Sequence, residues 1–240
     1  MALAPTVLAL CDATPVPFLC GERLVYSAHA GPGLNGRAEM WVDGPVDFKG
    51  TSVMVLHSVI TGGVGPFKLS DKTTSWFDPE RMASLRFLKE ERHPMGRHNE
   101  DVEMDAATLT WRAVDGRTGT SPSAQPLDEL SFIYALRSMN IPDDSTVVLN
   151  RHFDAERNPT KLRSLGRGSV KTDEGTYATR DVEMRVRDAR RYRGEGTIKI
   201  SFSDDACRRP IRIESKIPNA GTVVMTLTSA EPATTGCAPR

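Results

Sequence analysis

The sequence lacks an excess of charge of either sign. Its 31 basic and 31 acidic residues cancel, which leaves a formal net charge of zero over 240 residues. Without a global field, nucleic acid or an anionic membrane could be attracted only by a local patch. We therefore expect no nucleic-acid partner.

Long apolar runs are absent as well. Glycine, histidine or charged residues interrupt even the most apolar segments, so none approaches the roughly 20 residues that a membrane helix requires. We expect no transmembrane segment. The apolar content of 39% is nevertheless that of a globular protein with a sizeable core. We predict one domain over residues 18–229, with tails at 1–17 and 230–240.

Cysteine is scarce, and the four cysteines show neither a CxxC pair nor metal-ligand spacing: Cys11, Cys20, Cys207 and Cys237. They allow three pairings, among which the sequence does not choose, and free thiols are an alternative. In an exported protein, Cys11 with Cys20 or Cys207 with Cys237 would tie a tail to the body. The apolar first 13 residues are typical of the end of an export signal, although the basic leader is missing. Lipidation of Cys11 stays an alternative, which the bulky residue before it disfavours.

Catalytic motifs are also missing. No serine or cysteine lies in a GxSxG or similar setting, so the sequence predicts no hydrolase. The densest group of metal-ligand residue types is His93 to His98 with Glu90, Glu91, Glu100 and Asp101 around it. We interpret this group as a solvated loop, with a divalent-ion site as the alternative. We expect no metal and no cofactor, and the sequence favours a non-catalytic protein while leaving enzymatic activity undecided.

Alternation of apolar and polar residues dominates what is present. In residues 37–42, for example, Ala38, Met40 and Val42 share one face and Trp41 lies opposite. Turn-forming Gly, Pro, Asn and Asp clusters separate such segments, which is typical of an antiparallel meander. The predicted strands are residues 22–28, 37–42, 51–60, 85–91, 99–104, 108–114, 146–153, 162–171, 177–186, 197–202, 211–217 and 222–227.

One segment, residues 125–139, has helical periodicity instead. A proline opens it, acids fill the first turn, and Leu127, Leu130, Ile133 and Tyr134 form an apolar stripe. A weaker helical turn is predicted over residues 78–84. We predict a mainly β (α+β) fold: a single strongly curved antiparallel sheet or open barrel, with the main helix packed on its concave face.

Three motifs together resemble a known family. They are Phe18-x-x-Gly21-Glu22-x-Leu24-x-Tyr26, the segment Leu127 to Arg137, and Ser203-Asp204-Asp205-x-x-Arg208-x-Pro210. Their order and spacing are similar to the landmarks of the bacterial exported family known as domain of unknown function 3108. The resemblance implies a periplasmic or outer-envelope protein, similar in style to carriers that hold acyl chains against a helix. It implies no catalytic residues.

Candidate residues fall into two groups. A lipid or acyl chain held between helix and sheet would contact aromatic and apolar side chains. The candidate ligand-binding residues are Tyr26, Trp41, Trp76, Leu130, Tyr134 and Arg137. The candidate structural anchors are Glu22, Asp128, Asp205 and Arg208. Glu22 is expected to pair with a buried arginine such as Arg137, with general acid or base as the alternative.

The charged segments have ordinary explanations too. Asp205 and Arg208 suggest a metal or phosphate site, but hairpin-turn chemistry explains them better. The arginine-rich residues 180–193 favour charge pairing between strands, with a phosphate-rich headgroup as the alternative.

Three functions follow, in order of preference. The first is a non-catalytic envelope protein that binds an apolar ligand such as a lipid. The second is a structural or protein-interaction component of the cell envelope. The third is a carbohydrate-active enzyme, which needs carboxylates such as Glu22, Asp128 or Asp205 to converge in a cleft.

Overall fold

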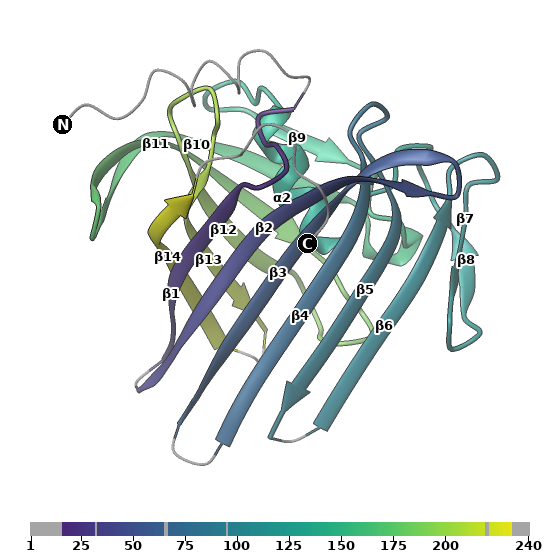
Figure 1. The fold of residues 1–240 in the computed structure, drawn as a ribbon, viewed down its shortest axis with the longest axis horizontal. Helices are drawn as coiled ribbons and strands as arrows, with labels where there is room; N and C mark the ends of the chain where they lie inside the picture. Colours follow the sequence, from purple (N-terminus) through teal and green to yellow (C-terminus); the bar gives the residue numbers. More distant parts are fainter. Residues whose placement is uncertain (1–15, 32, 65–66, 95, 219–220, 232–240) are drawn as a thin grey trace.

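The computed structural model describes residues 16–231 except 32, 65–66, 95 and 219–220 (Figure 1). Within these residues, 14 strands form one antiparallel sheet, accompanied by helix α2 (Glu129–Ser138) and the 3₁₀ turn η1 (Ala155–Arg157). The strands are β1 (Arg23–Ala30), β2 (Leu34–Phe48), β3 (Thr51–Val64), β4 (Phe67–Asp78), β5 (Ala83–His93), β6 (Gly96–Asp105), β7 (Thr110–Ala113), β8 (Thr118–Thr120), β9 (Thr146–Leu149), β10 (Thr160–Thr172), β11 (Gly175–Val186), β12 (Gly196–Ser203), β13 (Pro210–Ile217) and β14 (Gly221–Glu231).

The sheet is assembled from two meanders. Its spatial order is β8-β7-β6-β5-β4-β3-β2-β1-β14-β13-β12-β11-β10-β9. The chain runs outward from β1 to β8, passes through α2, and returns from β9 to β14, which pairs with β1. Strands β8 and β9 form the two edges, so the sheet is open. The prediction of a single antiparallel sheet is confirmed.

Alternating burial explains the individual strands. In β2, Ala38, Met40 and Val42 are all at most 1% exposed, whereas Trp41 lies on the other face and stacks on His57 with ring centroids 4.6 Å apart. The predicted alternation of this strand is confirmed. One face of β2 therefore supplies core contacts and the other meets solvent.

Register shifts interrupt five of the strand pairs: β1 with β14, β2 with β3, β4 with β5, β10 with β11 and β12 with β13. Such bulges bend a strand and increase its twist. In β2 the shift lies between Asp43 and Val46, where Gly44 has a φ of +114°. Pro45 follows, and a bulge tolerates a residue that has no backbone N–H.

Two strands escaped the sequence prediction, and two predicted elements are wrong. Strands β4 and β8 were not expected at all. Residues 79–82 form a tight turn rather than a helical one, because Asp78 Oδ1 accepts the N–H groups of Glu80 and Arg81 and Met82 has a φ of +55°. The strand predicted for residues 146–153 ends at Leu149.

Helix α2 begins with a capping box. Asp128 Oδ1 accepts the N–H groups of Leu130 and Ser131, and Ser131 Oγ accepts the N–H of Asp128. Ser75 on β4 also donates to the Asp128 carboxylate at 2.5 Å, so the cap is tied to the sheet. The predicted helix is confirmed, with narrower bounds.

The apolar core has two parts. The larger joins α2 to β1–β4 and β10–β14, with Leu24, Tyr26, Leu127 and Phe202 fully buried. The smaller surrounds Phe87 on β5. No helix among the described residues has the length and apolar character needed to cross a membrane.

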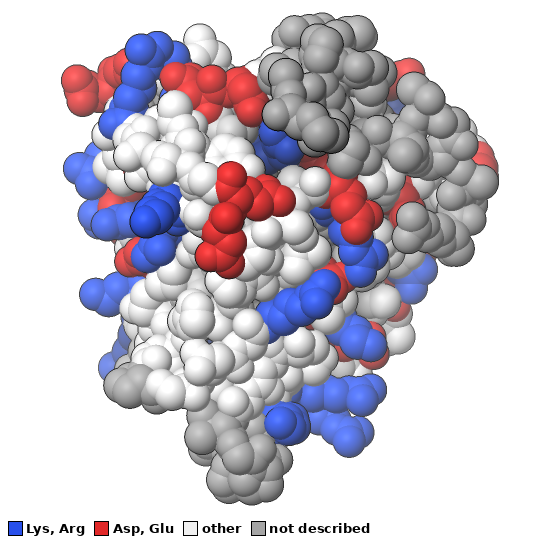
Figure 2. All heavy atoms as spheres, turned by 60° about the vertical axis from the view of Figure 1, so that its left-hand side comes forward, with Lys and Arg blue, Asp and Glu red and all other residues white. Residues whose placement is uncertain are grey.

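Charges on the surface are mixed. On the face in Figure 2, basic and acidic side chains are interspersed. In the arginine-rich segment, Arg180 lies 2.7 Å from Asp204 and Arg187 lies 2.9 Å from Glu195. These contacts are the charge pairing that the sequence favours there.

Candidate functional site

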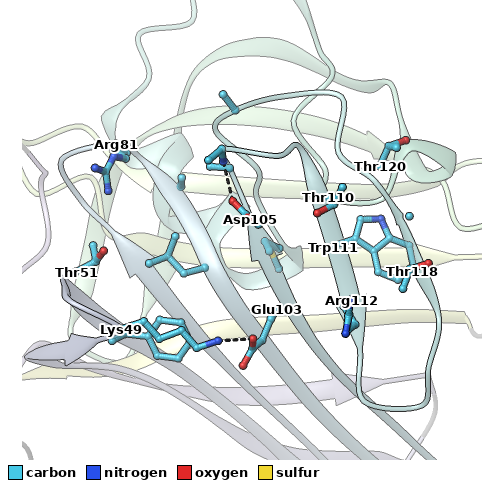
Figure 3. Close-up of a pocket in the computed structure, with 18 residues that line it drawn as sticks. Lys49, Thr51, Arg81, Glu103, Asp105, Thr110, Trp111, Arg112, Thr118 and Thr120 are labelled. Atoms are coloured by element: carbon cyan, nitrogen blue, oxygen red, sulfur yellow. Dashed lines mark hydrogen bonds and ion pairs between the residues drawn. The ribbon is translucent and has the colours of Figure 1, made fainter.

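A groove of about 1170 Å³ crosses the ends of strands β5 to β8 (Figure 3). The turns that join β2 to β3, β4 to β5 and β6 to β7 also contribute to its lining. Its volume slightly exceeds the roughly 300–1,000 Å³ that is typical of small-molecule sites. Sequence reasoning missed the groove because its residues come from six strands, three turns and the segment after β8.

Apolar side chains contribute much of the lining, namely Phe48, Leu85, Met104 and Trp111. Trp111 is 6% exposed and packs edge-on against Phe153, with centroids 5.6 Å apart. Its Nε1–H is buried and has no hydrogen-bond partner among the described residues. Gly119 lies against the indole so closely that a Cβ there would stand 2.6 Å from two ring carbons. Glycine at this position therefore fixes where the indole lies.

Charged side chains supply the rest of the lining. Lys49 Nζ lies 2.5 Å from Glu103 Oε2, and Asp105 accepts two backbone N–H groups of its own turn. A hydrogen bond from the Thr108 side chain, together with these two backbone hydrogen bonds, lowers the pKa of Asp105. Arg81 pairs with Asp78 outside the groove at 3.0 Å. The remaining cation is Arg112, which is exposed and forms no hydrogen bond or ion pair with any described residue.

Glu22 and Arg137 form the most buried ion pair of the described chain. The Arg137 side chain is fully buried, and its Nη1 and Nη2 lie 2.5 and 2.8 Å from the two Glu22 oxygens. Arg137 also donates to the carbonyl groups of Pro17 and Cys207. Although burial opposes the charge, Glu22 raises the pKa of Arg137 further. The pair ties α2 to the chain before β1 and to the β12–β13 turn.

The other candidate ligand-binding residues do not form one site. Tyr26, Leu130 and Tyr134 are at most 4% exposed and belong to the larger core, where the Tyr26 hydroxyl donates to the carbonyl of Pro210. Trp41 and Trp76 are half-buried and belong to neither core cluster. Trp76 contacts Arg86, whose guanidinium carbon is 4.8 Å from the ring centroid.

The structure gives the remaining anchors separate local partners. Asp128 caps α2, as described above. Asp205 accepts from Ser203 Oγ and from the N–H groups of Cys207 and Arg208, which closes the β12–β13 turn. Arg208 donates to the carbonyl of Met139 at the end of α2. The carboxylates of Glu22, Asp128 and Asp205 therefore hold three different parts of the fold, and none of them lines the groove.

A buried ionic cluster escaped sequence reasoning. Its centre is Arg157 of η1, which is 5% exposed and has ion pairs to carboxylates from four parts of the chain: Glu100, Glu129, Asp154 and Asp188. Single-sequence patterns could not find it, because its members are solitary charged residues on separate elements.

Lys89 on β5 extends the ionic cluster. It lies 2.6 Å from Glu129 and 3.1 Å from Glu91, and Arg191 lies 2.8 Å from Glu91. Burial opposes the charge of Lys89, but the two glutamates raise its pKa. Burial likewise favours neutral Glu129, yet Lys89 and Arg157 hold the pKa of Glu129 well below its usual range.

Three potential metal ligands lie next to this cluster. Asp71, Glu91 and His93 bring one ligand atom each within 4.8 Å of the others. Lys89 and Arg191 already neutralise Glu91, and His93 lies 2.9 Å from Asp71. Two cations so close to the site disfavour a divalent ion. The geometry supports an ion-pair network better than a metal centre.

Both cysteines within the described residues, Cys20 and Cys207, are disulfide-bonded. The predicted pairings involve Cys11 and Cys237, which lie outside the described residues. The alternative of lipidation also concerns Cys11.

Comparison with known proteins gives a family and a fold. A family model described as protein of unknown function (DUF3108) matches residues 25–228. No curated protein matches the chain. A solved β-barrel-like protein of domain of unknown function DUF1849 from Brucella abortus is similar at a TM-score of 0.60, with 12% identity over 90% of this chain and 99% of that one. A putative lipoprotein from Parabacteroides distasonis gives a TM-score of 0.33 and 11% identity, over 90% and 98% of the two chains. At 12% identity the first likeness supports the fold alone.

Proposed function

Because the chain belongs to the DUF3108 family of proteins of unknown function, we propose its function from its geometry: it is a non-catalytic cell-envelope protein that binds an apolar ligand such as an acyl chain. The single observation that carries the proposal is the groove at β5–β8, with its apolar lining of Phe48, Leu85, Met104 and Trp111. Phe48 and Leu85 are half-buried, so an acyl chain along them would cover apolar surface that water otherwise contacts, whereas Met104 and Trp111 are only 6% exposed.

The site differs from the one that the sequence favours. We propose that helix α2 lies on the concave side of the sheet. Its residues Leu130 and Tyr134, and Leu127 just before it, are already buried against core side chains, so they are not available to a ligand. Phe18, for example, contacts Tyr134 with ring centroids 5.0 Å apart. We therefore assign the ligand to the groove rather than to the space under the helix.

The disulfides support an envelope location. Disulfides persist in the periplasm and outside the cell and are rare in the reducing cytosol. Cys20 and Cys207 are both oxidised in the structure. We propose a periplasmic or outer-envelope protein with one domain over residues 18–229.

A binding experiment tests this function. Purified protein is titrated with a fluorescent acyl probe, and the variant Ala107→Trp fills the groove from an exposed lining position. We expect saturable binding that Ala107→Trp weakens. The matched control is Ala178→Trp, which adds the same bulk at an exposed position on β11 outside the groove. Absence of probe binding to the unmodified protein, or equal loss in both variants, would refute the proposal.

A further inference from the structure

The charges of the groove specify more than an apolar ligand. Five ionisable side chains line it: Lys49, Arg81, Arg112, Glu103 and Asp105. Cations outnumber acids by one. The groove therefore combines apolar surface with a small excess of positive charge, which is the complement of an anionic amphiphile.

The excess charge resides on Arg112. The carboxylate of Glu103 is the cross-strand neighbour of Arg112 in the β6–β7 register, but Lys49 binds it at 2.5 Å. Asp105 is engaged by the backbone of its own turn. Arg112 thus has an acidic neighbour whose charge is already taken by a second cation, and it has no ionic partner among the described residues.

A free guanidinium is a specific receptor. Its planar donors match the two oxygens of a carboxylate or phosphate. In Figure 3, Arg112 and the Lys49–Glu103 pair lie at the same end of the groove, whereas Arg81 lies away from them. Along β7, Arg112 alternates with the buried Trp111, so it points to the exposed face of the strand, as Glu103 does on β6. An anionic head at Arg112 would lie at the exposed border of the groove and leave the rest of it to an acyl chain.

We infer that the ligand of the groove is a single-chain amphiphile with an anionic head, whose carboxylate or phosphate binds Arg112. This inference rests on the proposed function. It adds the charge and the orientation of the ligand, which an apolar site alone does not define.

Isothermal titration at concentrations below micelle formation tests the inference with four probes of equal chain length: dodecanoate, dodecyl phosphate, dodecanol and dodecyltrimethylammonium. We expect the two anions to bind roughly tenfold more tightly than dodecanol, as a charge-assisted hydrogen bond at a partly screened site would give. The stronger of the two anions identifies the head. The cation is expected to bind most weakly.

Two substitutions should act in opposite directions. Arg112→Gln is expected to reduce dodecanoate affinity to the level of dodecanol. Glu103→Gln removes the competing carboxylate and should tighten dodecanoate binding severalfold. The matched control is Arg97→Gln, which removes one positive charge at an exposed position on β6 outside the groove and should leave both affinities unchanged.

Failure of the inference and failure of the proposed function give different results. If dodecanol binds as tightly as dodecanoate, or if Arg112→Gln matches Arg97→Gln, the anionic head is refuted while acyl binding stands. If none of the four probes binds, both proposals are refuted. A steeper salt dependence for dodecanoate than for dodecanol would support the ionic contact.

Discussion

Replacement of Arg137 with methionine removes the cation from the most buried ion pair of the described chain. The change deletes five hydrogen bonds, two to Glu22 and three to the carbonyl groups of Pro17 and Cys207. Methionine fills similar volume, so the main loss is electrostatic. The Glu22 side chain, which is only 7% exposed, then has no counter-ion. Loss of one partner of a buried pair costs about 3–5 kcal/mol of unfolding free energy.

This cost translates into a measurable shift. For a domain of 150–250 residues, each kcal/mol changes the melting temperature by about 2–4 °C, which gives a decrease of roughly 6–20 °C for Arg137→Met. Urea denaturation of the oxidised protein, followed by circular dichroism, measures the free energy directly. The double variant Glu22→Gln with Arg137→Met should recover part of the loss, because no unpaired charge stays buried.

A surface pair provides the control. Arg212 and Glu214 are 3.6 Å apart with side chains 41% and 36% exposed, so Arg212→Met should cost about 1 kcal/mol or less. The reasoning is refuted if Arg137→Met costs no more than Arg212→Met, or if the double variant shows simple additivity.

Three further predictions follow from the buried groups. Burial and Arg157 lower the pKa of His152 to about 3, whereas the unfolded residue titrates near 6.5. The unfolded chain thus binds the extra proton, and the free energy of unfolding falls as the pH falls between these values. Between pH 7 and pH 5, the unmodified protein should lose about 2 kcal/mol more of this free energy than His152→Gln does, as measured by urea denaturation. Gly119→Ala should displace the Trp111 indole, cost about 1–3 kcal/mol and change the tryptophan emission spectrum. Arg191→Gln should accelerate amide hydrogen exchange in β5 and residues 187–195, while unchanged exchange there would show that the Arg191–Glu91 pair does not hold the loop.

The elements with apolar alternation were predictable, and the exceptions have a physical cause. Strand β4 was missed because its residues Asp71 and Thr73 alternate with other polar residues. Their neighbours across the sheet are Glu91 and Lys89. A strand that faces an ionic cluster carries polar residues on both faces, so its sequence lacks the apolar period that marks a half-buried strand. Strand β8 has only three residues, too few for any period.

The pair of Glu22 and Arg137 shows what sequence could suggest about contacts. Both residues lie in segments with readable patterns, and a buried cation needs a counter-ion, so the pairing was a reasonable hypothesis. No sequence pattern indicated the groove. Phe48, Leu85 and Trp111 are 26 or more residues apart in sequence, and only the turns and the twist of the sheet bring them together.

The distribution of charge also explains how an open sheet keeps its curved form. A barrel closes by hydrogen bonds between its first and last strands, but β8 and β9 are unpaired edges. Ion pairs bridge the two meanders instead. Arg157, which follows β9, reaches Glu100 on β6, and Arg191 between β11 and β12 reaches Glu91 on β5. Because these side-chain ion pairs connect the meanders across the opening, the edge strands β8 and β9 form no backbone hydrogen bonds with each other. The groove beside β8 can therefore exist where a closed barrel would have placed another strand.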